Sequence, residues 1–336
     1  MSTHGHPDWQ TGRIIEAVAV TPTARRITIE RPAGRRAAPG THVDVRVRLP
    51  GDQRTDTRSY SVVESNADGS RLTVTVLRVV ESRGGSAYMH GLEVGDTLET
   101  TQPLQNFPLR VGAPRYLLVA GGIGITAVVE MARVLQSIQA DYELVYVGRS
   151  RELLAYLDIL QETHGDRLRV HVDDEGNPLD VAKLVESVAS DQASAATELY
   201  MCGPIRLMDG IRRAWETAEL SPANLRYETF GNSGWFDPED FVVRIPELGI
   251  ETLVGSQHTM LEALTEAGAD LMYDCRKGEC GLCRVDIEQV DGAIDHRDVF
   301  FSRSQHEDNR QLCTCVSRAV ATESSGRPPV VSLRLS

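Results

Sequence analysis

Alternating apolar and polar residues mark the first third of the chain. The alternation is clearest in THVDVRVRL (41–49) and RLTVTVLRVV (71–80), and it is typical of strands with one buried face. The turn-forming sequences PGT, NADG and VGD separate such runs. Many short strands joined by turns predict a small antiparallel β-barrel over residues 10–110.

Apolar runs followed by helical periodicity replace this pattern near residue 113. Four pairs of a strand and a helix are predicted: 115–126 with 127–138, 142–148 with 152–165, 168–174 with 180–189, and 198–204 with 205–218. Strands that alternate with helices predict a parallel sheet with helices on both faces. The second predicted domain is therefore an α/β domain over residues 111–229.

The pattern changes a third time near residue 230. FGNSGWFDPED (230–240) is rich in glycine, asparagine and acidic residues and predicts a linker. Beyond it, FVVRIPELGIETLV (241–254) predicts a hairpin, and residues 259–268 predict a helix that ends at Gly268. A third domain is therefore expected over residues 241–336.

Composition excludes two classes of partner. The 336 residues are 41% hydrophobic and 25% charged, and no apolar run approaches the roughly 18 residues of a membrane span. The first residues lack the apolar core of a secretory signal, so a cytoplasmic location is expected. The net charge of −13 argues against nucleic-acid binding. Neither a membrane nor a nucleic-acid partner is expected.

Cysteines gather near the C-terminus. CRKGECGLC (275–283) spaces Cys275, Cys280 and Cys283 as C-x4-C-x2-C, the spacing of plant-type [2Fe–2S] ligands. Gly278 and Gly281 would let backbone N–H groups approach sulfur. Structural zinc prefers two separate C-x2-C pairs, and a reducing cytoplasm disfavours disulfides. The segment therefore predicts a [2Fe–2S] cluster.

Two cysteines compete for the fourth ligand position. Cys313 has the usual separation from Cys283, whereas Cys315 lies two residues further on, within TCV. A turn in QVDGAI (289–294) would absorb the two additional residues. We favour Cys315, and the other cysteine is then expected to be a buried thiol beside the cluster.

Glycine turns in the α/β domain predict a nucleotide site. AGGIGIT (120–126) follows a strand and opens a helix, where glycine and the helix N-terminus favour a pyrophosphate. MCGP (201–204) ends a later strand at the same edge of a parallel sheet. The candidate residues of these two turns are Gly121, Gly122, Gly124, Thr126, Cys202, Gly203 and Pro204. The alternatives are an ordinary strand-to-helix turn and an inert core cysteine.

Arg149 and Ser150 follow the second strand of this domain, where groups that reach the adenine ribose are expected. Arginine can also meet a 2′-phosphate, so NADH and NADPH both remain open. A pair of surface residues is the alternative interpretation.

Two segments of the barrel region predict a flavin site. In RSYSV (58–62), Arg58 can pair with a phosphate, Tyr60 can lie along the flavin, and Ser61 can hydrogen-bond the ring. RGGS (83–86) can form an anion nest. The candidate residues are Arg58, Tyr60, Ser61, Val76, Arg83, Gly84, Gly85 and Ser86. Each is weak alone, because arginine is usually a surface charge and Gly-Gly is usually a turn.

The order of the motifs along the chain resembles that of the phthalate dioxygenase reductase family. The motifs are R-x-Y-S, R-G-G-S, G-G-I-G-I-T, C-G-P and the C-terminal cysteines. Members of this family are FMN-containing reductases of Rieske oxygenase systems, including vanillate demethylase reductases. Four further segments also resemble segments of this family: PLQNFPL (103–109), YETFGN (227–232) with Phe230, DHRD (295–298) and CVSRA (315–319). The longer loop before the last ligand departs from the family pattern. The resemblance implies FMN, a ferredoxin reductase-like barrel and a plant-type ferredoxin (β-grasp) domain.

Electron counting then predicts the function. A nicotinamide delivers two electrons and a [2Fe–2S] cluster accepts one, so a flavin is expected between them. The expected order is NADH, FMN, cluster and a separate terminal oxygenase, most simply of the Rieske type. The chain is expected to be a monomer without catalytic acid–base residues, and QHEDN (305–309) is expected to be a solvated loop. A cytochrome P450 reductase and an iron–sulfur redox sensor are the alternatives.

Overall fold

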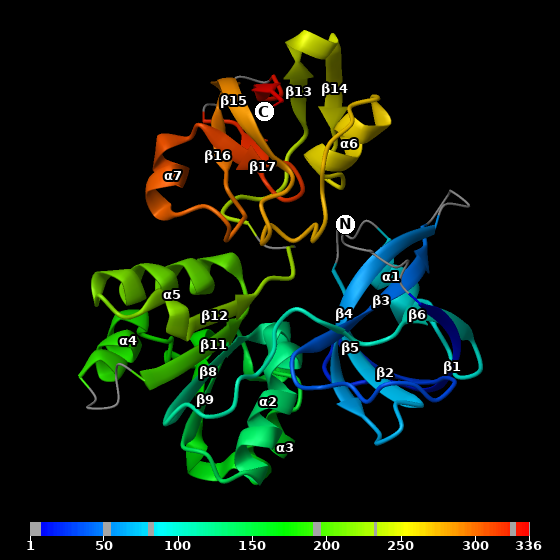
Figure 1. Ribbon diagram of the computed structural model, residues 1–336, viewed down its shortest axis with the longest axis vertical. Coiled ribbons are helices and arrows are strands. Elements are labelled where there is room, and N and C mark those ends of the chain that lie inside the picture. The colour runs from blue at the N-terminus through cyan, green and yellow to red at the C-terminus, as the bar shows by residue number, and fades with distance from the viewer. Residues whose placement is uncertain are drawn as a thin grey trace. The chain divides into compact units, whose positions relative to one another are not determined.

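The computed structural model describes residues 8–49, 55–79, 84–190, 196–231, 234–322 and 327–335. They form two compact units. One unit contains the residues up to Glu228 except 204–213, and the other contains 204–213 and the residues from Thr229 onward. Figure 1 shows the elements of both units.

The first unit begins with an antiparallel barrel. Its strands are β1 (Trp9–Ala19), β2 (Ala24–Glu30), β3 (Thr41–Arg48), β4 (Thr55–Ser65), β5 (Arg71–Leu77), β6 (Thr97–Thr101) and β7 (Leu104–Gln105). Hydrogen bonding runs β4-β5-β2-β1-β6-β3-β7, and an additional β3–β4 pairing closes a ring of six strands. Inward-facing Val43, Val45 and Val47 of β3 are fully buried in its core. The alternating pattern therefore predicted the barrel correctly.

The sequence pattern did not predict a short helix in the barrel. Helix α1 (Gly85–Gly91) follows Gly84, whose φ of 93° is in the left-handed region. The Tyr88 N–H donates to the Gly84 carbonyl at 2.8 Å. Seven residues with two glycines carry too little periodicity to predict a helix.

A five-stranded parallel sheet completes the first unit. Its strands are β8 (Arg115–Gly121), β9 (Tyr142–Gly148), β10 (Leu168–Val172), β11 (Thr197–Cys202) and β12 (Leu225–Glu228), in the order β10-β9-β8-β11-β12. The helices of this region are α2 (Ile125–Ser137), α3 (Leu157–His164), α4 (Val181–Ala189) and α5 (Ile205–Thr217). The strand–helix alternation predicted this sheet correctly.

The second of these helices begins later than the sequence predicted. Residues 152–156 lie outside α3, because Tyr156 has a left-handed φ of 66° and Leu154 is extended. The Tyr156 hydroxyl meets that of Thr75 on β5. A contact with a distant strand thus overrides the local preference for helix.

The second unit contains a mixed sheet in the order β14-β13-β19-β15-β17. Its strands are β13 (Phe241–Ile245), β14 (Ile250–Val254), β15 (Arg284–Asp291), β17 (Gln311–Cys313) and β19 (Val330–Arg334), and β16 (Ala293–Asp295) pairs separately with β18 (Arg318–Val320). Strands β13 and β14 form the predicted antiparallel hairpin. Helix α6 (Met260–Glu266) packs its Met260 and Leu264 into the core, and Gly268 follows it with a φ of 94°.

One prediction for this unit was wrong. QHEDN was expected to be a solvated loop, but most of it lies in α7 (Arg303–Asp308). Ser302 caps this helix, and the side chain of Gln305 hydrogen-bonds back to the Ser302 N–H. Six residues are too short to show helical periodicity, so only the cap could have indicated the helix.

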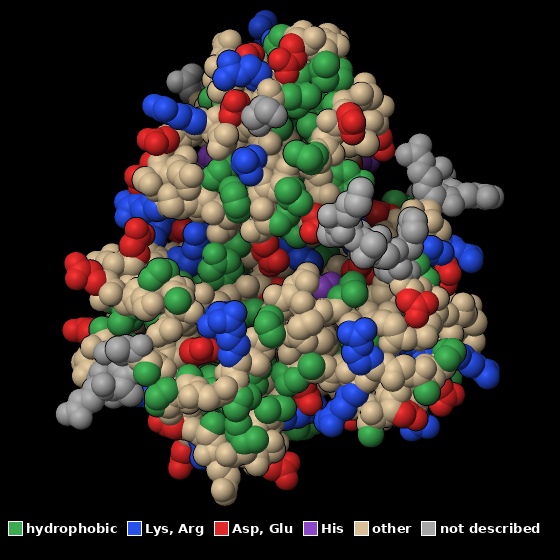
Figure 2. Space-filling view, viewed as in Figure 1, with side chains coloured by type: hydrophobic (Ala, Val, Ile, Leu, Met, Phe, Trp, Pro, Cys, Tyr) green, Lys and Arg blue, Asp and Glu red, His purple; other side chains and the backbone are tan. Residues whose placement is uncertain are grey.

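Acidic and basic side chains are interspersed on the face that Figure 2 shows. Within the described part of the chain, none of the helices has the length and apolar character needed to cross a membrane.

The cap of α6 gives a test of how this domain is stabilised. The Thr259 hydroxyl accepts the Glu262 N–H at 3.1 Å, and Glu262 accepts the Thr259 N–H at 2.9 Å. Thr259→Ala should lower the free energy of unfolding by about 1 kcal/mol. The measurement is the denaturant midpoint at which the visible absorbance of the assembled cluster is lost.

Thr265→Ala on the same helix is the matched control. The Thr265 hydroxyl donates to the Leu261 carbonyl one turn earlier, an interaction that adds little to helix stability. Equal midpoints for the two variants would contradict the capping role of Thr259.

Candidate cofactor-binding sites

The loop between α6 and β15 surrounds the sulfur of Cys275 with backbone donors. The N–H groups of Lys277, Glu279 and Cys280 each donate to Cys275 Sγ at 3.4 Å. Such N–H···S contacts stabilise negative charge on a thiolate that ligates a metal. The loop therefore fits the side of an iron–sulfur cluster that the sequence predicted.

Two glycines allow this loop to close. Gly278 and Gly281 have φ values of 74° and 69°, which disfavour other residues. A Cβ on Gly278 would lie 2.8 Å from Val316 and 2.9 Å from the Asp298 Cα, and one on Gly281 would lie 2.3 Å from the Phe300 ring. Backbone conformation and lack of space both require glycine.

Three buried thiols converge behind the loop. The side chains of Cys313 and Cys315 hydrogen-bond Cys283 and lower the pKa of Cys283 to about 3. The same contacts, with burial, raise the pKa values of Cys313 and Cys315. A site that gathers this many sulfurs suits a soft metal or an iron–sulfur cluster.

The surroundings of the two competing cysteines differ. Cys315 interacts with both Cys275 and Cys283, and the Gly278 N–H donates to it. Cys313 instead interacts with Cys283, Cys315 and Asp298. Cys315 therefore neighbours two of the other predicted ligands, which supports Cys275, Cys280, Cys283 and Cys315 as the proposed set.

Sequence reasoning missed an anchor of the cluster loop. The Thr229 hydroxyl donates to the Lys277 carbonyl at 2.6 Å, and the Thr229 N–H donates to Glu279 Oε1 at 2.7 Å. Thr229 is buried and the adjacent Phe230 is half-buried. The YETF sequence drew attention only to Phe230, since a threonine carries no pattern of its own.

In the barrel, the predicted flavin residues of β4 and α1 lie together. The Arg58 side chain passes over Gly85, where a Cβ would come within 2.9 Å of it. Arg58 also pairs with Asp56 and donates to the Thr57 carbonyl at 2.9 Å. Its guanidinium thus lies beside the Gly84–Gly85 turn, as a shared phosphate site requires.

The other flavin candidates have more varied surroundings. Burial raises the pKa of Tyr60 to about 12. Ser61 is buried and its hydroxyl lies 3.4 Å from Oε2 of buried Glu228, a carboxylate that sequence reasoning missed. The Ser86 hydroxyl accepts the Val79 N–H at 3.2 Å. Val76 packs its side chain into the barrel core.

Arg83 lies outside the described residues.

The two glycine turns of the α/β domain meet at the carboxyl edge of the sheet. Cys202 pairs with Ala120 in adjacent strands, and a Cβ on Gly124 would lie 2.2 Å from the Cys202 carbonyl oxygen. Gly122 has a left-handed φ of 52°. The turns of Gly121 and Gly203 are thus neighbours, as expected for a dinucleotide site.

The remaining nucleotide candidates divide into exposed and buried groups. Arg149 is exposed and Ser150 half-exposed after β9. Thr126 is buried, and its hydroxyl donates to the Ile123 carbonyl at 2.9 Å. Cys202 is also buried, whereas Pro204 is exposed at the start of α5.

The glycine requirement can be tested with one substitution in the cluster loop. Gly278→Ala should sharply reduce the iron bound per chain, because its Cβ would collide with Val316 and Asp298. Gly249→Ala is the matched control, since Gly249 has a similar φ of 64° and open space around its Cα. The control should cost only about 1 kcal/mol of stability and retain its iron. Equal iron content in both variants would contradict the steric argument.

A pair of serine substitutions tests the fourth ligand. Cys315→Ser should lose the [2Fe–2S] absorbance and its EPR signal, because serine removes a thiolate ligand. Cys313→Ser, two residues away, should retain both. The reverse result would assign the ligand to Cys313.

Two family models match the chain. Residues 244–320 match the 2Fe-2S iron-sulfur cluster binding domain, and residues 118–213 match the oxidoreductase NAD-binding domain. The carnitine monooxygenase reductase subunit of Acinetobacter pittii is 31% identical over 89% of this chain and 96% of its own length.

Solved structures extend the comparison. Phthalate dioxygenase reductase, described as modular for electron transfer from pyridine nucleotides to [2Fe–2S], is 27% identical with a TM-score of 0.69 and covers 97% of this chain and 98% of its own. An intact type IV self-sufficient cytochrome P450 monooxygenase is 33% identical with a TM-score of 0.62. It covers 99% of this chain, which spans only 42% of that longer protein. The chain belongs to the phthalate dioxygenase reductase-like family of oxygenase reductases.

Proposed function

We propose that this protein passes electrons from NADH through a flavin and a [2Fe–2S] cluster to a separate terminal oxygenase. Two observations carry the proposal: three backbone N–H groups donate to Cys275 Sγ, and Cys315 lies near both Cys275 and Cys283. When bound, the flavin accepts hydride and supplies single electrons, and the cluster carries them one at a time. The relative from Acinetobacter pittii, which is named as a reductase subunit of a monooxygenase, supports the same direction of transfer.

The chain's own residues hold and orient these groups. Gly122 and Gly124 open the helix N-terminus for a pyrophosphate, and Arg58 beside Gly85 would hold a terminal phosphate. A single phosphate site of this kind favours FMN over FAD. Lys277, Glu279 and Cys280 orient their N–H groups toward one ligand sulfur, and Thr229 fixes the loop that carries them.

The acceptor is proposed to be a Rieske-type oxygenase in the cytoplasm, with this reductase as a monomer. The resemblance to the reductases of Rieske systems supports the partner. A haem oxygenase is a second candidate, because a self-sufficient P450 monooxygenase contains a region similar to the whole of this chain.

An anaerobic titration of the holoprotein with NADH tests the electron path. We expect the flavin absorbance to bleach and the frozen sample to show the rhombic EPR signal of a reduced [2Fe–2S] cluster. Bleaching without that signal would indicate a plain flavin reductase. An absence of bleaching would contradict the proposed use of NADH.

The type of acceptor needs a separate measurement. Purified Rieske and P450 oxygenases are each mixed with the reduced protein, and the rate of electron acceptance is measured. The Rieske oxygenase should accept electrons faster. Reduction of the P450 is monitored through its carbon monoxide band. If the P450 is reduced faster than the Rieske oxygenase, the Rieske assignment is contradicted.

A further inference from the structure

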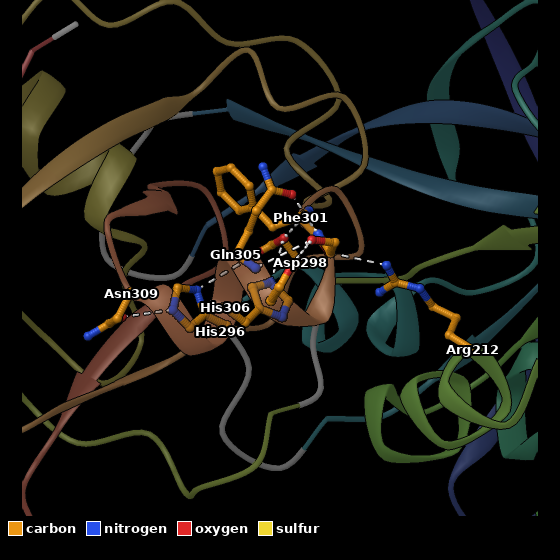
Figure 3. Close-up of polar contacts among 9 residues, drawn as sticks. Arg212, His296, Asp298, Phe301, Gln305, His306 and Asn309 are labelled. Carbon is orange, nitrogen blue, oxygen red and sulfur yellow. Dashed lines mark hydrogen bonds and ion pairs between the residues drawn. The ribbon is translucent and has the colours of Figure 1, made fainter. Parts of the chain in front are cut away.

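Three metal-binding side chains gather beside the cluster loop. His296 and Asp298 follow β16, and His306 lies on α7. One donor atom from each residue lies within 4.8 Å of the others. Figure 3 shows both imidazoles directed toward the Asp298 carboxylate. None of the three belongs to the proposed cluster ligands.

One ring nitrogen of His296 that could ligate a metal has no hydrogen-bond partner among the described residues. Its Nε2 lies 2.9 Å from Asn309 Oδ1, which can only accept. A proton on Nε2 would leave the lone pair of a neutral ring at Nδ1. Among the described residues, buried Nδ1 has no hydrogen-bond partner, and neither has Asp298 Oδ1, 3.8 Å away. The two atoms face each other and could share a cation.

The second oxygen of the carboxylate is better satisfied. Asp298 Oδ2 accepts the Phe301 N–H at 2.9 Å and lies 3.0 Å from Nε2 of His306. Burial alone would raise the pKa of Asp298, but the neighbouring imidazoles of His296 and His306 outweigh it and hold that pKa well below its usual range. The site therefore offers a buried negative charge and two imidazoles.

The separations suit a small divalent cation. Zinc binds imidazole nitrogen and carboxylate oxygen at about 2.0–2.2 Å in a tetrahedron, which places its ligands about 3.3–3.6 Å apart. The separation of 3.0 Å between His306 Nε2 and Asp298 Oδ2 and that of 3.8 Å between His296 Nδ1 and Asp298 Oδ1 bracket this value. We propose that His296, Asp298 and His306 bind a first-row divalent metal ion, preferentially zinc, with a fourth position for water.

Ligand chemistry and access support the choice of metal. Imidazole donors suit zinc, copper, iron and nickel, whereas magnesium and calcium take oxygen ligands. The two imidazole rings stack with centroids 4.5 Å apart. The His306 side chain is 19% exposed while that of Asp298 is fully buried, so an ion can enter from the side of α7.

The proposed ion would connect α7 to the cluster loop. The Val299 N–H donates to the Gly278 carbonyl at 3.0 Å, and a Cβ on Gly278 would lie 2.9 Å from the Asp298 Cα. Because His306 comes from α7, an ion would tie that helix to the segment that supports the loop. This site goes beyond the proposed electron transfer and does not rest on it.

Zinc binding to the cluster-containing full chain tests the proposal. The protein is treated with a chelator, desalted and dialysed against buffered zinc, and zinc and iron are measured together. We expect one zinc per chain without loss of iron. His306→Gln should weaken zinc binding at least tenfold, whereas His258→Gln, at an exposed histidine of the same domain, should not. No zinc uptake with intact iron, or equal affinity in both variants, would overturn the proposal.

X-ray absorption at the zinc edge gives a readout that does not depend on a variant folding. Nitrogen and oxygen neighbours at about 2.0–2.2 Å would support the site, whereas sulfur at about 2.3 Å would place zinc on the cysteines and overturn it. A rise in the thermal midpoint with zinc in the wild type, absent in Asp298→Asn, would support it further. Equal rises in both proteins would contradict it.

Discussion

Hydrogen bonds from the backbone to the Cys275 sulfur are the interaction on which the C-terminal domain depends. The N–H groups of Lys277, Glu279 and Cys280 can all point at one sulfur only if the loop turns tightly. That turn needs left-handed residues, and Arg276, Gly278 and Gly281 supply them. The surrounding walls leave no room for side chains at the two glycines. The conformation of this loop therefore requires glycine at two positions of the sequence CRKGECGLC.

The packing behind this loop extends the same constraint to distant parts of the chain. Leu261 of α6 packs with Cys283 and Cys315, and its N–H donates to the Thr314 carbonyl at 2.9 Å. Thr314 donates from both its N–H and its hydroxyl to the Cys283 carbonyl. A helix, a loop and the segment after β17 thus hold the sulfurs at fixed separations. Such rigidity is what a metal centre requires from its protein.

Two consecutive residues contact different segments in which cofactor sites are predicted. Glu228, the last residue of β12, approaches Ser61 in the predicted flavin segment, and the next residue, Thr229, anchors the cluster loop. The first belongs to one compact unit and the second to the other. The end of this strand is therefore a covalent connection between the two compact units, with a buried polar side chain on each side of the boundary.

The sequence by itself determined the features that depend on near neighbours in the chain. Alternation in β3 and β5, strand–helix alternation after residue 113 and the C-x4-C-x2-C spacing are local patterns, and each predicted its element or site. The tertiary structure alone decided the features that depend on contacts between distant residues. It brought Cys315 near Cys275 and Cys283, and it delayed the start of α3 until after Tyr156. It also brought His306 to Asp298. Contacts between residues that are distant in the chain leave no periodic pattern in the sequence. Only the folded chain reveals which of these residues come together.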